Sequence, residues 1–459
     1  MARGFSQIHG VDYDETFAPV VRITSLRIFL AIACHLDYRL THVDVKGAFL
    51  NADLEEELYL EIPEGLEIHA SLMKGFDVLS QDELCLLLLK NLYGLKQAGR
   101  SWYRMLNDFL TKYGFERSPV DNCIYIYRKG NGYMALMAYV DDIVIMCEFD
   151  DDRKDFMKTF TNEFIVTDLG DLSWYLGIAI EKGDDGCYYA HQEKYIMDMV
   201  RRFGLIDAKV KNTPITMDKL TRTDCPTDEE KKFEMMNVPY RSLVGSLLYA
   251  CTCTRPDIAF AVSNVSRFMS NPGMVHWTAA KRILRYLKGT KDLKLKFNPD
   301  CDLKLSGYCD ADWGGELDTR RSTTGYTFLY GNCGISWKSK LQKTVALSSA
   351  EAEYMGITAA TQECMYLRSL LRSLGYGDDD PTIIFEDNQA CIAMTKNPVL
   401  HGRSKHIDIR HHYVREKVES KEVSVTYRCT EDMLADVLTK SLSGKRHRML
   451  CSRMMGMND

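Results

Sequence analysis

The sequence predicts an α+β fold, and patterns of two different periods support this class. The run from Tyr133 to Val140 is apolar enough for a buried strand, and Ile143 to Met146 matches an antiparallel partner. Residues 25–36 instead repeat apolar side chains at helical spacing. The 459 residues, 46% of them hydrophobic, suffice for two or three domains with substantial cores.

Two adjacent carboxylates, Asp141 and Asp142, stand between these strands, where a tight hairpin normally turns through Asn-Gly or Asp-Gly. Like charges repel, and a carboxyl near a core favours its protonated form unless a cation pairs with it. Asp44 ends another alternating segment, residues 39–45, and supplies a third carboxylate. Mg²⁺ prefers oxygen ligands and is usually held by a few carboxylates together with substrate phosphates. The three acids therefore indicate a metal site, and the alternative is a solvated acidic turn.

The last third of the chain contains a second set of acids, two at predicted strand ends and two on predicted helices: Asp310, Asp387, Glu351 and Asp436. The helix that carries Glu351 is expected over residues 349–374. Taken singly, the acids have ordinary explanations, because Ser348 with Glu351 matches a capping box and Asp387 is a good helix N-cap. Taken together, they indicate a second metal site.

Bulk composition argues against a membrane protein and a disulfide scaffold. No apolar run approaches the length of a membrane span, and the N-terminus lacks a signal-peptide pattern. The 15 cysteines are odd in number and lack the spacing of a zinc site, so we expect reduced core residues.

The net charge of −6 is unusual for a nucleic-acid-binding protein, for which clustered Lys and Arg matter most. One basic run predicts a nucleic-acid track, with a solvated helix face as the alternative: Lys281, Arg282, Arg285 and Lys288.

Three stretches, in this order, resemble the reverse transcriptase of copia-type (Pseudoviridae-like) retrotransposons: VDVKGAFLNADLEEELY, LLKNLYGLKQAGRSWY and AYVDDIVI. Four later stretches resemble the ribonuclease H of the same family: GYCDADWGG, ALSSAEAEY, FEDNQACI and LADVLTKSL. The resemblance extends from Ala2 to about Leu442. It implies a fragment of an LTR retrotransposon Pol protein, in which a reverse transcriptase precedes a ribonuclease H.

This resemblance implies a right-hand polymerase palm with N-terminally truncated fingers over residues 1–182. A helical thumb or connection region is expected over residues 183–300, with a polar linker near 206–238. A ribonuclease H-like α/β domain would occupy residues 301–445, followed by a tail over residues 446–459. Residues 25–36 are expected to pack on the sheet of the palm.

Three residues match the family's nucleotide contacts. Phe49 stands where the family places a bulky residue that screens the sugar 2′ position. Gln97 would lie against the templating base pair and the incoming nucleotide, although Gly99 replaces a proline that is usual in the family. Arg3 is the one remaining candidate to grip the triphosphate, because the chain is expected to begin inside the fingers segment.

The resemblance also assigns metal ligands. Asp44 and Asp141 would bridge two Mg²⁺ ions, with Asp142 as an auxiliary ligand. A tetrad in the second domain would hold two further Mg²⁺ ions and direct a metal-activated water at RNA in a hybrid: Asp310, Glu351, Asp387 and Asp436. Mn²⁺ is the alternative ion. Many relatives outside this branch use a histidine before the last helix, and residues 429–433 contain none.

The expected function is RNA-directed DNA synthesis with ribonuclease H activity during retrotransposon replication. The expected partners are an RNA template, a DNA primer, an RNA–DNA hybrid and dNTPs, with no membrane. Copying in the family implies a cytoplasmic virus-like particle, with the nucleus as the alternative, and the sequence leaves open a monomer or a dimer. The rival interpretation is a catalytically silent truncated remnant that only binds nucleic acid, or one that retains hybrid cleavage alone.

Overall fold

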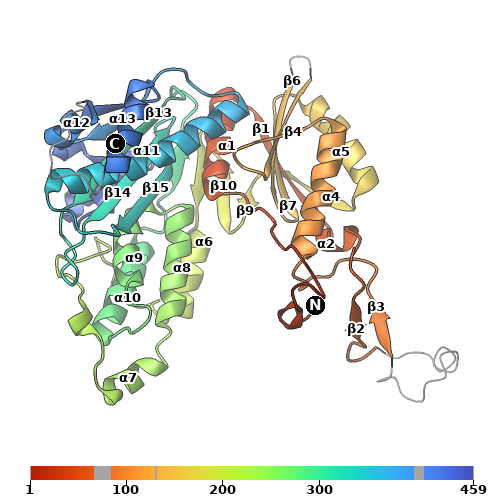
Figure 1. Ribbon diagram of the computed structural model, residues 1–459, viewed down its shortest axis with the longest axis horizontal. Coiled ribbons are helices and arrows are strands. Elements are labelled where there is room, and N and C mark those ends of the chain that lie inside the picture. The colour runs from red at the N-terminus through yellow and green to blue at the C-terminus, as the bar shows by residue number, and fades with distance from the viewer. Residues whose placement is uncertain (1, 67–83, 130–131, 397–407, 458–459) are drawn as a thin grey trace. The chain divides into compact units, whose positions relative to one another are not determined.

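The computed structural model describes residues 2–66, 84–129, 132–396 and 408–457 (Figure 1). Helices and four β-sheets make up this described part, which confirms the α+β class. The chain divides into two compact units, residues 1–22 with 39–172 and residues 23–38 with 173–459. None of the described helices is both long and apolar enough to cross a bilayer.

A six-stranded sheet in the order β4-β5-β6-β7-β1-β8 forms the centre of the first unit. Its strands are β1 (Arg39–Val45), β4 (Glu116–Arg117), β5 (Ile124–Lys129), β6 (Gly132–Tyr139), β7 (Asp142–Cys147) and β8 (Val166–Asp171). β1 pairs antiparallel with β7, and β7 pairs antiparallel with β6. This order brings the strand that carries Asp44 beside the β6–β7 hairpin, as the metal site predicted from the sequence requires.

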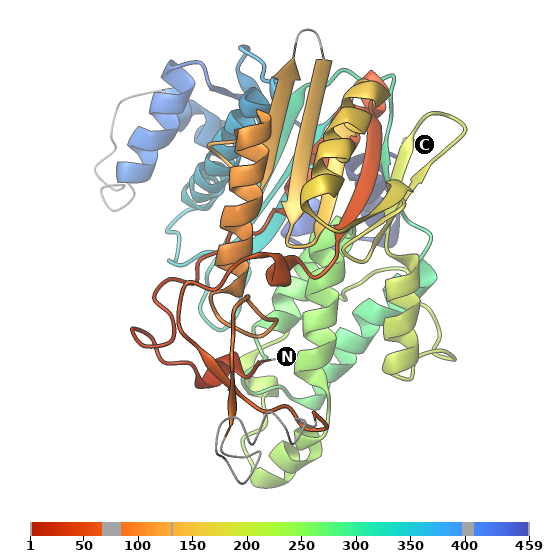
Figure 2. The same cartoon turned by 90° about the vertical axis from the view of Figure 1, so that its right-hand side faces the viewer.

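Two helices of the first unit lie side by side over one face of this sheet (Figure 2). The smaller elements and the helices are η1 (Gly4–Ser6), α2 (Ala48–Asn51), β2 (Tyr59–Glu61), β3 (Cys85–Leu87), α4 (Ala98–Tyr113) and α5 (Asp150–Glu163). Trp102, Leu106 and Leu110 recur one helical turn apart on α4 and pack with Phe160 of α5 in one core. Gly114, at φ 116°, ends α4 in the left-handed conformation that glycine adopts without strain.

The second unit begins with α1 (Ile23–Leu36) and continues from residue 173. A four-stranded sheet in the order β12-β11-β10-β9 contains β9 (Trp174–Tyr175), β10 (Ile178–Lys182), β11 (Tyr188–His191) and β12 (Leu295–Phe297). Its helical part contains α6 (Glu193–Arg202), η3 (Arg222–Asp224), α7 (Glu229–Met236), α8 (Tyr240–Cys253), η4 (Pro256–Ile258), α9 (Ala259–Ser266) and α10 (Met274–Gly289). Apolar residues of α6, α8, α9 and α10 share one buried core.

A five-stranded sheet in the order β15-β14-β13-β16-β17 completes the second unit. Its strands are β13 (Leu305–Asp312), β14 (Thr323–Tyr330), β15 (Cys333–Leu341), β16 (Thr382–Glu386) and β17 (Val423–Tyr427). The remaining elements are α11 (Ser349–Leu374), α12 (Gln389–Lys396), α13 (Asp408–Glu419), η6 (Thr430–Asp432), η7 (Leu434–Leu438) and α14 (Gly444–Met454). β13 is central, antiparallel to β14 and parallel to β16, and α11 packs on β13 and β14.

Two segments differ from the sequence-based expectation. Residues 446–459 were expected to form a tail, but most of them belong to α14, whose Leu450 and Met454 are buried against Leu329 and Val437. The polar stretch 206–238 contains η3 and α7 rather than only linker. The expected division at residue 300 falls within one compact unit, so the boundary there stays a prediction.

α1 also packs differently from the expectation, because its neighbours are β15, β11 and β12 of the second unit. A buried cation explains the difference. Arg27 donates to the carbonyl oxygens of Cys253 (3.2 Å), Ile335 (2.5 Å) and Thr252, and its guanidinium lies 3.7 Å from the centroid of the Trp337 ring. Burial lowers the pKa of Arg27 to about 10, which still leaves it charged at neutral pH. The helix therefore docks through a charged side chain that the apolar pattern does not reveal.

Replacing this cation should destabilise the second unit. In Arg27→Met the apolar stem remains but three carbonyl groups, two of them in buried hydrogen bonds, lose this donor, so we expect the free energy of unfolding to fall by about 3 kcal/mol. Urea titration monitored by tryptophan fluorescence measures this change. The exposed Arg448, substituted in the same way, is the matched control and should change stability by less than about 0.5 kcal/mol. Equal effects of the two substitutions would contradict the role of Arg27.

Candidate metal sites

The first acid cluster consists of Asp44, Asp141 and Asp142. In the pairing of β1 with β7, Asp44 and Asp142 are direct cross-strand partners, so their side chains leave the sheet on the same face. The backbone N–H of Val45 donates to the carbonyl oxygen of Asp141 at 2.9 Å, which ties the hairpin tip to β1. Strand pairing thus places the three acids at one end of the sheet, although one oxygen from each does not meet the other two within 4.8 Å in this structure.

The tip of the hairpin is Val140-Asp141, rather than the Asp-Asp pair expected from the sequence, because Asp142 is already the first residue of β7. Val140 has a φ of 56°, a left-handed conformation that costs a β-branched residue roughly 1–2 kcal/mol. The indole N–H of Trp102 donates to the carbonyl oxygen of Val140 at 2.7 Å. This bond from the buried α4 helps to hold the strained turn, and with it the position of Asp141.

Basic side chains already contact two acids of the first acid cluster. Lys46 Nζ lies 2.6 Å from Asp44 Oδ2, and His42 Nε2 lies 2.9 Å from Asp142 Oδ1. Burial raises the pKa of Asp141, and the negative charges of Asp142 and Asp44 raise it further. The carboxylates are therefore close enough to repel one another, which is the electrostatic condition that a bound cation would relieve.

The predicted nucleotide contacts are only partly assembled. The Phe49 ring lies 4.6 Å from the ring of Tyr93, between centroids. Burial, together with the charges of Asp141 and Asp44, raises the pKa of Tyr93, so this aromatic pair lies beside the first acid cluster. The sequence analysis missed Tyr93, although it stands in the same stretch as Gln97.

Gln97 is bonded to other protein groups, and Arg3 is exposed. Gln97 is buried, donates to the Asp12 carbonyl (3.0 Å) and to Glu56 (3.2 Å), and accepts from Gln7 (3.0 Å). The side chain of Arg3 is exposed next to η1. Their predicted contact with a nucleotide stays a prediction.

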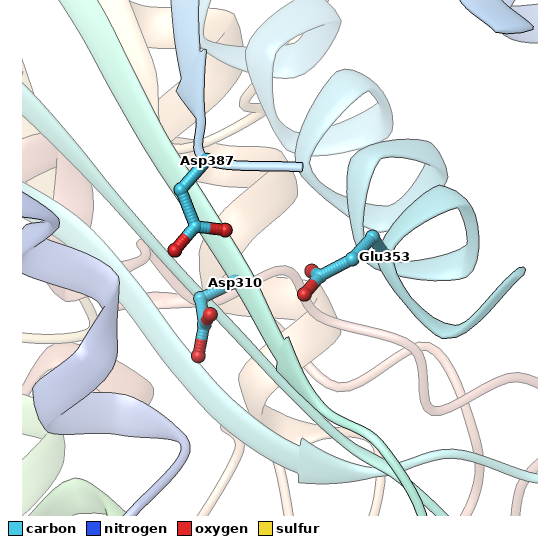
Figure 3. A group of neighbouring side chains, drawn as sticks. All are labelled: Asp310, Glu353 and Asp387. Atoms are coloured by element: carbon cyan, nitrogen blue, oxygen red, sulfur yellow. The ribbon is translucent and has the colours of Figure 1, made fainter. Parts of the chain in front are cut away.

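The second acid cluster consists of Asp310, Glu353 and Asp387. One carboxylate oxygen from each residue lies within 4.8 Å of the other two, and within the described residues no other group of three such ligands was found. Figure 3 shows the carboxylates directed toward one another from β13, from α11 and from the segment that follows β16. Two neighbouring parallel strands and one covering helix therefore converge on a single point.

Glu353 takes the place in this cluster that the sequence analysis gave to Glu351. The carboxylate of Glu351 instead accepts from the backbone N–H of Leu347 at 2.8 Å, while the Ser348 hydroxyl accepts from the N–H of Glu351. Glu351 thus caps the start of α11. Glu353, two residues later, lies on nearly the opposite side of the helix and faces β13. The structure therefore brings Glu353, and not Glu351, to Asp310 and Asp387, and Glu351 as a ligand stays a prediction.

A divalent cation fits the second acid cluster. Glu353 is 6% exposed, and its Oε2 atom has no hydrogen-bond partner among the described residues. Burial raises the pKa of Glu353 to about 11, and the charges of Glu386 and Asp310 add to the shift. Burial likewise raises the pKa of Asp310 to about 6. These ligands are all carboxylate oxygens, and burial and mutual repulsion destabilise their negative charges. Such a set suits a hard ion such as Mg²⁺.

Asp436, the fourth acid of the predicted tetrad, lies beside the second acid cluster but is paired with cations. It is fully buried on η7, and Arg446 of α14 forms an ion pair with its Oδ2 atom. Lys440 Nζ lies 2.8 Å from Asp436 Oδ1, a charge contact without aligned hydrogen-bond geometry, and 3.4 Å from Asp310 Oδ1. Burial opposes the charge of Lys440, but the carboxylates of Asp310 and Asp436 outweigh it and raise the pKa of the ammonium.

Two threonines orient the acids and were missed by the sequence analysis. Thr439 donates its hydroxyl to Asp310 Oδ2, and Thr430 donates its hydroxyl to Asp387 Oδ2 at 2.7 Å. Thr430 belongs to the loop in which many relatives outside this branch carry a histidine. Neither threonine follows a period or a charge pattern, so only the folded loop reveals its role.

The cations of the predicted nucleic-acid track contact groups of the protein itself in this structure. Arg282 donates to the Thr213 hydroxyl (2.9 Å), Arg285 to the Lys209 carbonyl (2.6 Å), and Lys288 to the Ala208 carbonyl (3.0 Å). Lys281 Nζ lies 5.3 Å from the centroid of the Trp277 ring. Three of the four cations thus fasten residues 208–213 onto α10, and contact with nucleic acid stays a prediction.

Residues 1–217 match the family model described as reverse transcriptase (RNA-dependent DNA polymerase). The chain is 41% identical over 461 residues to the retrovirus-related Pol polyprotein from transposon TNT 1-94 of Nicotiana tabacum, covering 100% of this chain and 34% of that protein. It is 36% identical over 460 residues to the Pol polyprotein from transposon RE1 of Arabidopsis thaliana, covering 99% of this chain and 30% of that protein. The chain thus spans about a third of the length of these plant relatives.

A shorter relative is covered over its whole length. The chain is 30% identical over 323 residues to the putative transposon Ty5-1 protein of Saccharomyces cerevisiae, covering 70% of this chain and 100% of that protein. Among solved structures, a foamy viral protease-reverse transcriptase in complex with an RNA/DNA hybrid has a TM-score of 0.45 at 11% identity, covering 90% of this chain and 46% of that chain.

The raised pKa of Asp310 should make stability depend on pH. Folding moves this pKa from 3.8 to about 6, so between these values the folded chain binds more protons than the unfolded chain. The free energy of unfolding should therefore fall as the pH rises from about 4 to about 6. In Asp310→Asn this fall should be smaller by about 2 kcal/mol, measured by urea titration in EDTA across that range.

The exposed Asp302 of the same unit provides the control. Asp302→Asn should keep the wild-type pH dependence, because that carboxyl is solvated in both states. If the free energy of unfolding of Asp310→Asn changed with pH as steeply as that of the wild type, burial of this carboxyl would not determine the pH dependence.

Proposed function

Because the chain belongs to the copia-type retrotransposon Pol family, we propose that it is an RNA-directed DNA polymerase that also cleaves the RNA of RNA–DNA hybrids. The observation that carries the proposal is the pair of acid clusters, each assembled at the ends of neighbouring strands within its own unit. The proposed partners are an RNA template, a DNA primer, the hybrid and dNTPs, and the proposed location is the cytoplasm.

For DNA synthesis, Asp44 and Asp141 are the residues that would hold Mg²⁺, with Asp142 as an auxiliary ligand. Two bound ions would activate the primer 3′-hydroxyl and stabilise the leaving pyrophosphate. Lys46 and His42 contribute by holding Asp44 and Asp142 in place. We propose that Phe49, backed by Tyr93, screens the sugar 2′ position of the incoming nucleotide.

For hybrid cleavage, the second acid cluster would hold Mg²⁺. Mg²⁺ held there would supply positive charge that lowers the pKa of a water and stabilises the phosphate. In the hydrolysis the water oxygen bonds to a phosphorus of the RNA strand, the P–O3′ bond breaks and O3′ takes up a proton. Thr439 and Thr430 support this by fixing the oxygens of Asp310 and Asp387. The 2′-hydroxyl and the shallow minor groove of the hybrid distinguish RNA from DNA.

The second candidate function is hybrid cleavage without DNA synthesis. One observation favours it: the amide of Gln97 is already bonded to Gln7, Asp12 and Glu56, so it must release these groups before it can contact a nucleotide. A protein that only binds nucleic acid is the remaining alternative. Activity assays on separate substrates distinguish the three.

Single substitutions should separate the two activities. Asp141→Asn should lower dTTP incorporation on poly(rA)·oligo(dT) by at least about 100-fold and leave hybrid cleavage unchanged, because it removes one ligand from the first acid cluster alone. Asp387→Asn should have the opposite effect. Cleavage without incorporation in the wild type would support the second candidate, and the absence of both reactions would refute the proposal.

The two glutamates near the start of α11 provide a matched pair. Glu353→Gln should reduce hybrid cleavage by at least about 100-fold, because it removes a carboxylate from the second acid cluster. Glu351→Gln keeps the cap and should retain cleavage within about threefold, since an amide oxygen can still accept from Leu347. The assay follows release of labelled RNA from a hybrid. A greater loss in Glu351→Gln would reverse the assignment.

A further inference from the structure

We propose that the ammonium of Lys440 occupies the second cation position of the hybrid-cleavage site, so that this site takes one divalent ion instead of two. The inference rests on the proposed function and changes its metal requirement, because a two-metal scheme expects the tetrad to hold a pair of ions. The inference follows from the positions of the four acids, because three of them meet and the fourth is paired with cations.

The four acids do not form one group. Asp310, Glu353 and Asp387 meet within 4.8 Å, and the unpartnered Oε2 atom of the buried Glu353 belongs to this group (Figure 3). Asp436 is not part of it, and Lys440 Nζ contacts both Asp436 (2.8 Å) and Asp310 (3.4 Å). The geometry therefore gives one position bounded by three acids and a second position, between two acids, that already contains a charge.

Both oxygens of Asp436 already face a cation, although Oδ1 has no hydrogen-bond partner among the described residues. Its Oδ1 atom contacts Lys440, and its Oδ2 atom is paired with Arg446, which also donates to the Thr430 carbonyl at 2.5 Å. The carboxylate is fully buried, whereas the side chains of Lys440 and Arg446 are 35% and 32% exposed. A divalent ion at Asp436 would have to displace one of two cations that the fold places there.

The backbone below Lys440 is fixed as well. The N–H groups of Thr439 and Lys440 both donate to the carbonyl oxygen of Asp436, each at 3.2 Å, and the Thr439 hydroxyl donates to Asp310. The side chain of Lys440 thus leaves a hydrogen-bonded turn, and its ammonium lies between Asp310 and Asp436. An ion entering this position would meet a positive charge at bonding distance, and the repulsion opposes its binding.

The test counts bound ions in the full chain. The background carries Asp44→Asn and Asp141→Asn, so that the first acid cluster binds no ion. Mn²⁺ is titrated into each variant, and free Mn²⁺ is followed by electron paramagnetic resonance. We expect one bound Mn²⁺ in the background chain and two in Lys440→Met, which removes the charge and keeps the length of the stem.

Three variants control for charge and folding. Lys440→Arg keeps the cation and should bind one Mn²⁺. Lys445→Met removes an exposed charge nearby and should also bind one. Asp387→Asn should lose tight binding altogether, which identifies the counted ion with the second acid cluster. Circular dichroism confirms that each variant is folded.

Two results would overturn the inference: two Mn²⁺ ions in the background chain, or a single ion in folded Lys440→Met. The first result is available even where Lys440→Met does not fold. Counting ions needs no cleavage, so a chain that binds one ion but cleaves no hybrid would contradict the proposed function and leave the inference intact.

Discussion

Repulsion among carboxylates that the sheets force together is the constraint on which both sites depend. Strand pairing fixes Asp44 opposite Asp142, and parallel pairing of β13 with β16 brings Asp387 near Asp310, whatever charge these residues carry. The fold offsets the repulsion differently at the two places. Lys46 and His42 contact the first acid cluster at its edge, whereas Lys440 and Arg446 reach the acids from a separate loop and helix.

The spacing of apolar residues and the residues that cap helices predicted several of the elements. The strands β1, β6 and β7 and the helix α11 lie within a residue or two of their expected bounds, because apolar alternation and the Ser348 cap are local signals. The hairpin tip was placed one residue late, since the left-handed conformation of Val140 depends on Trp102, which lies 38 positions away. A non-local hydrogen bond leaves no trace in the pattern around the turn.

The acids of the sites were predictable as a set, but not all individually. Glu351 and Glu353 are two positions apart, so they face roughly opposite sides of α11 and only one can face β13. The capping box identified at Ser348 already used Glu351, which was a signal that Glu353 is the free carboxylate. The contacts of Arg27, Arg285 and Lys288 could not be predicted from the sequence for another reason. Their partners are backbone carbonyls of segments that lie far away in the sequence, which sequence composition does not specify.

The helix α14 sets a limit on where this protein can be divided. Its Leu450 and Met454 fill an apolar core with Leu329 and Val437, and its Arg446 contributes half of the counter-charge around Asp436. An expressed fragment that stops at residue 445 would expose that apolar surface and leave a buried carboxylate short of a cation. Such a fragment would tend to aggregate, and any inactivity it showed would reflect the missing helix and not the chemistry of its acids.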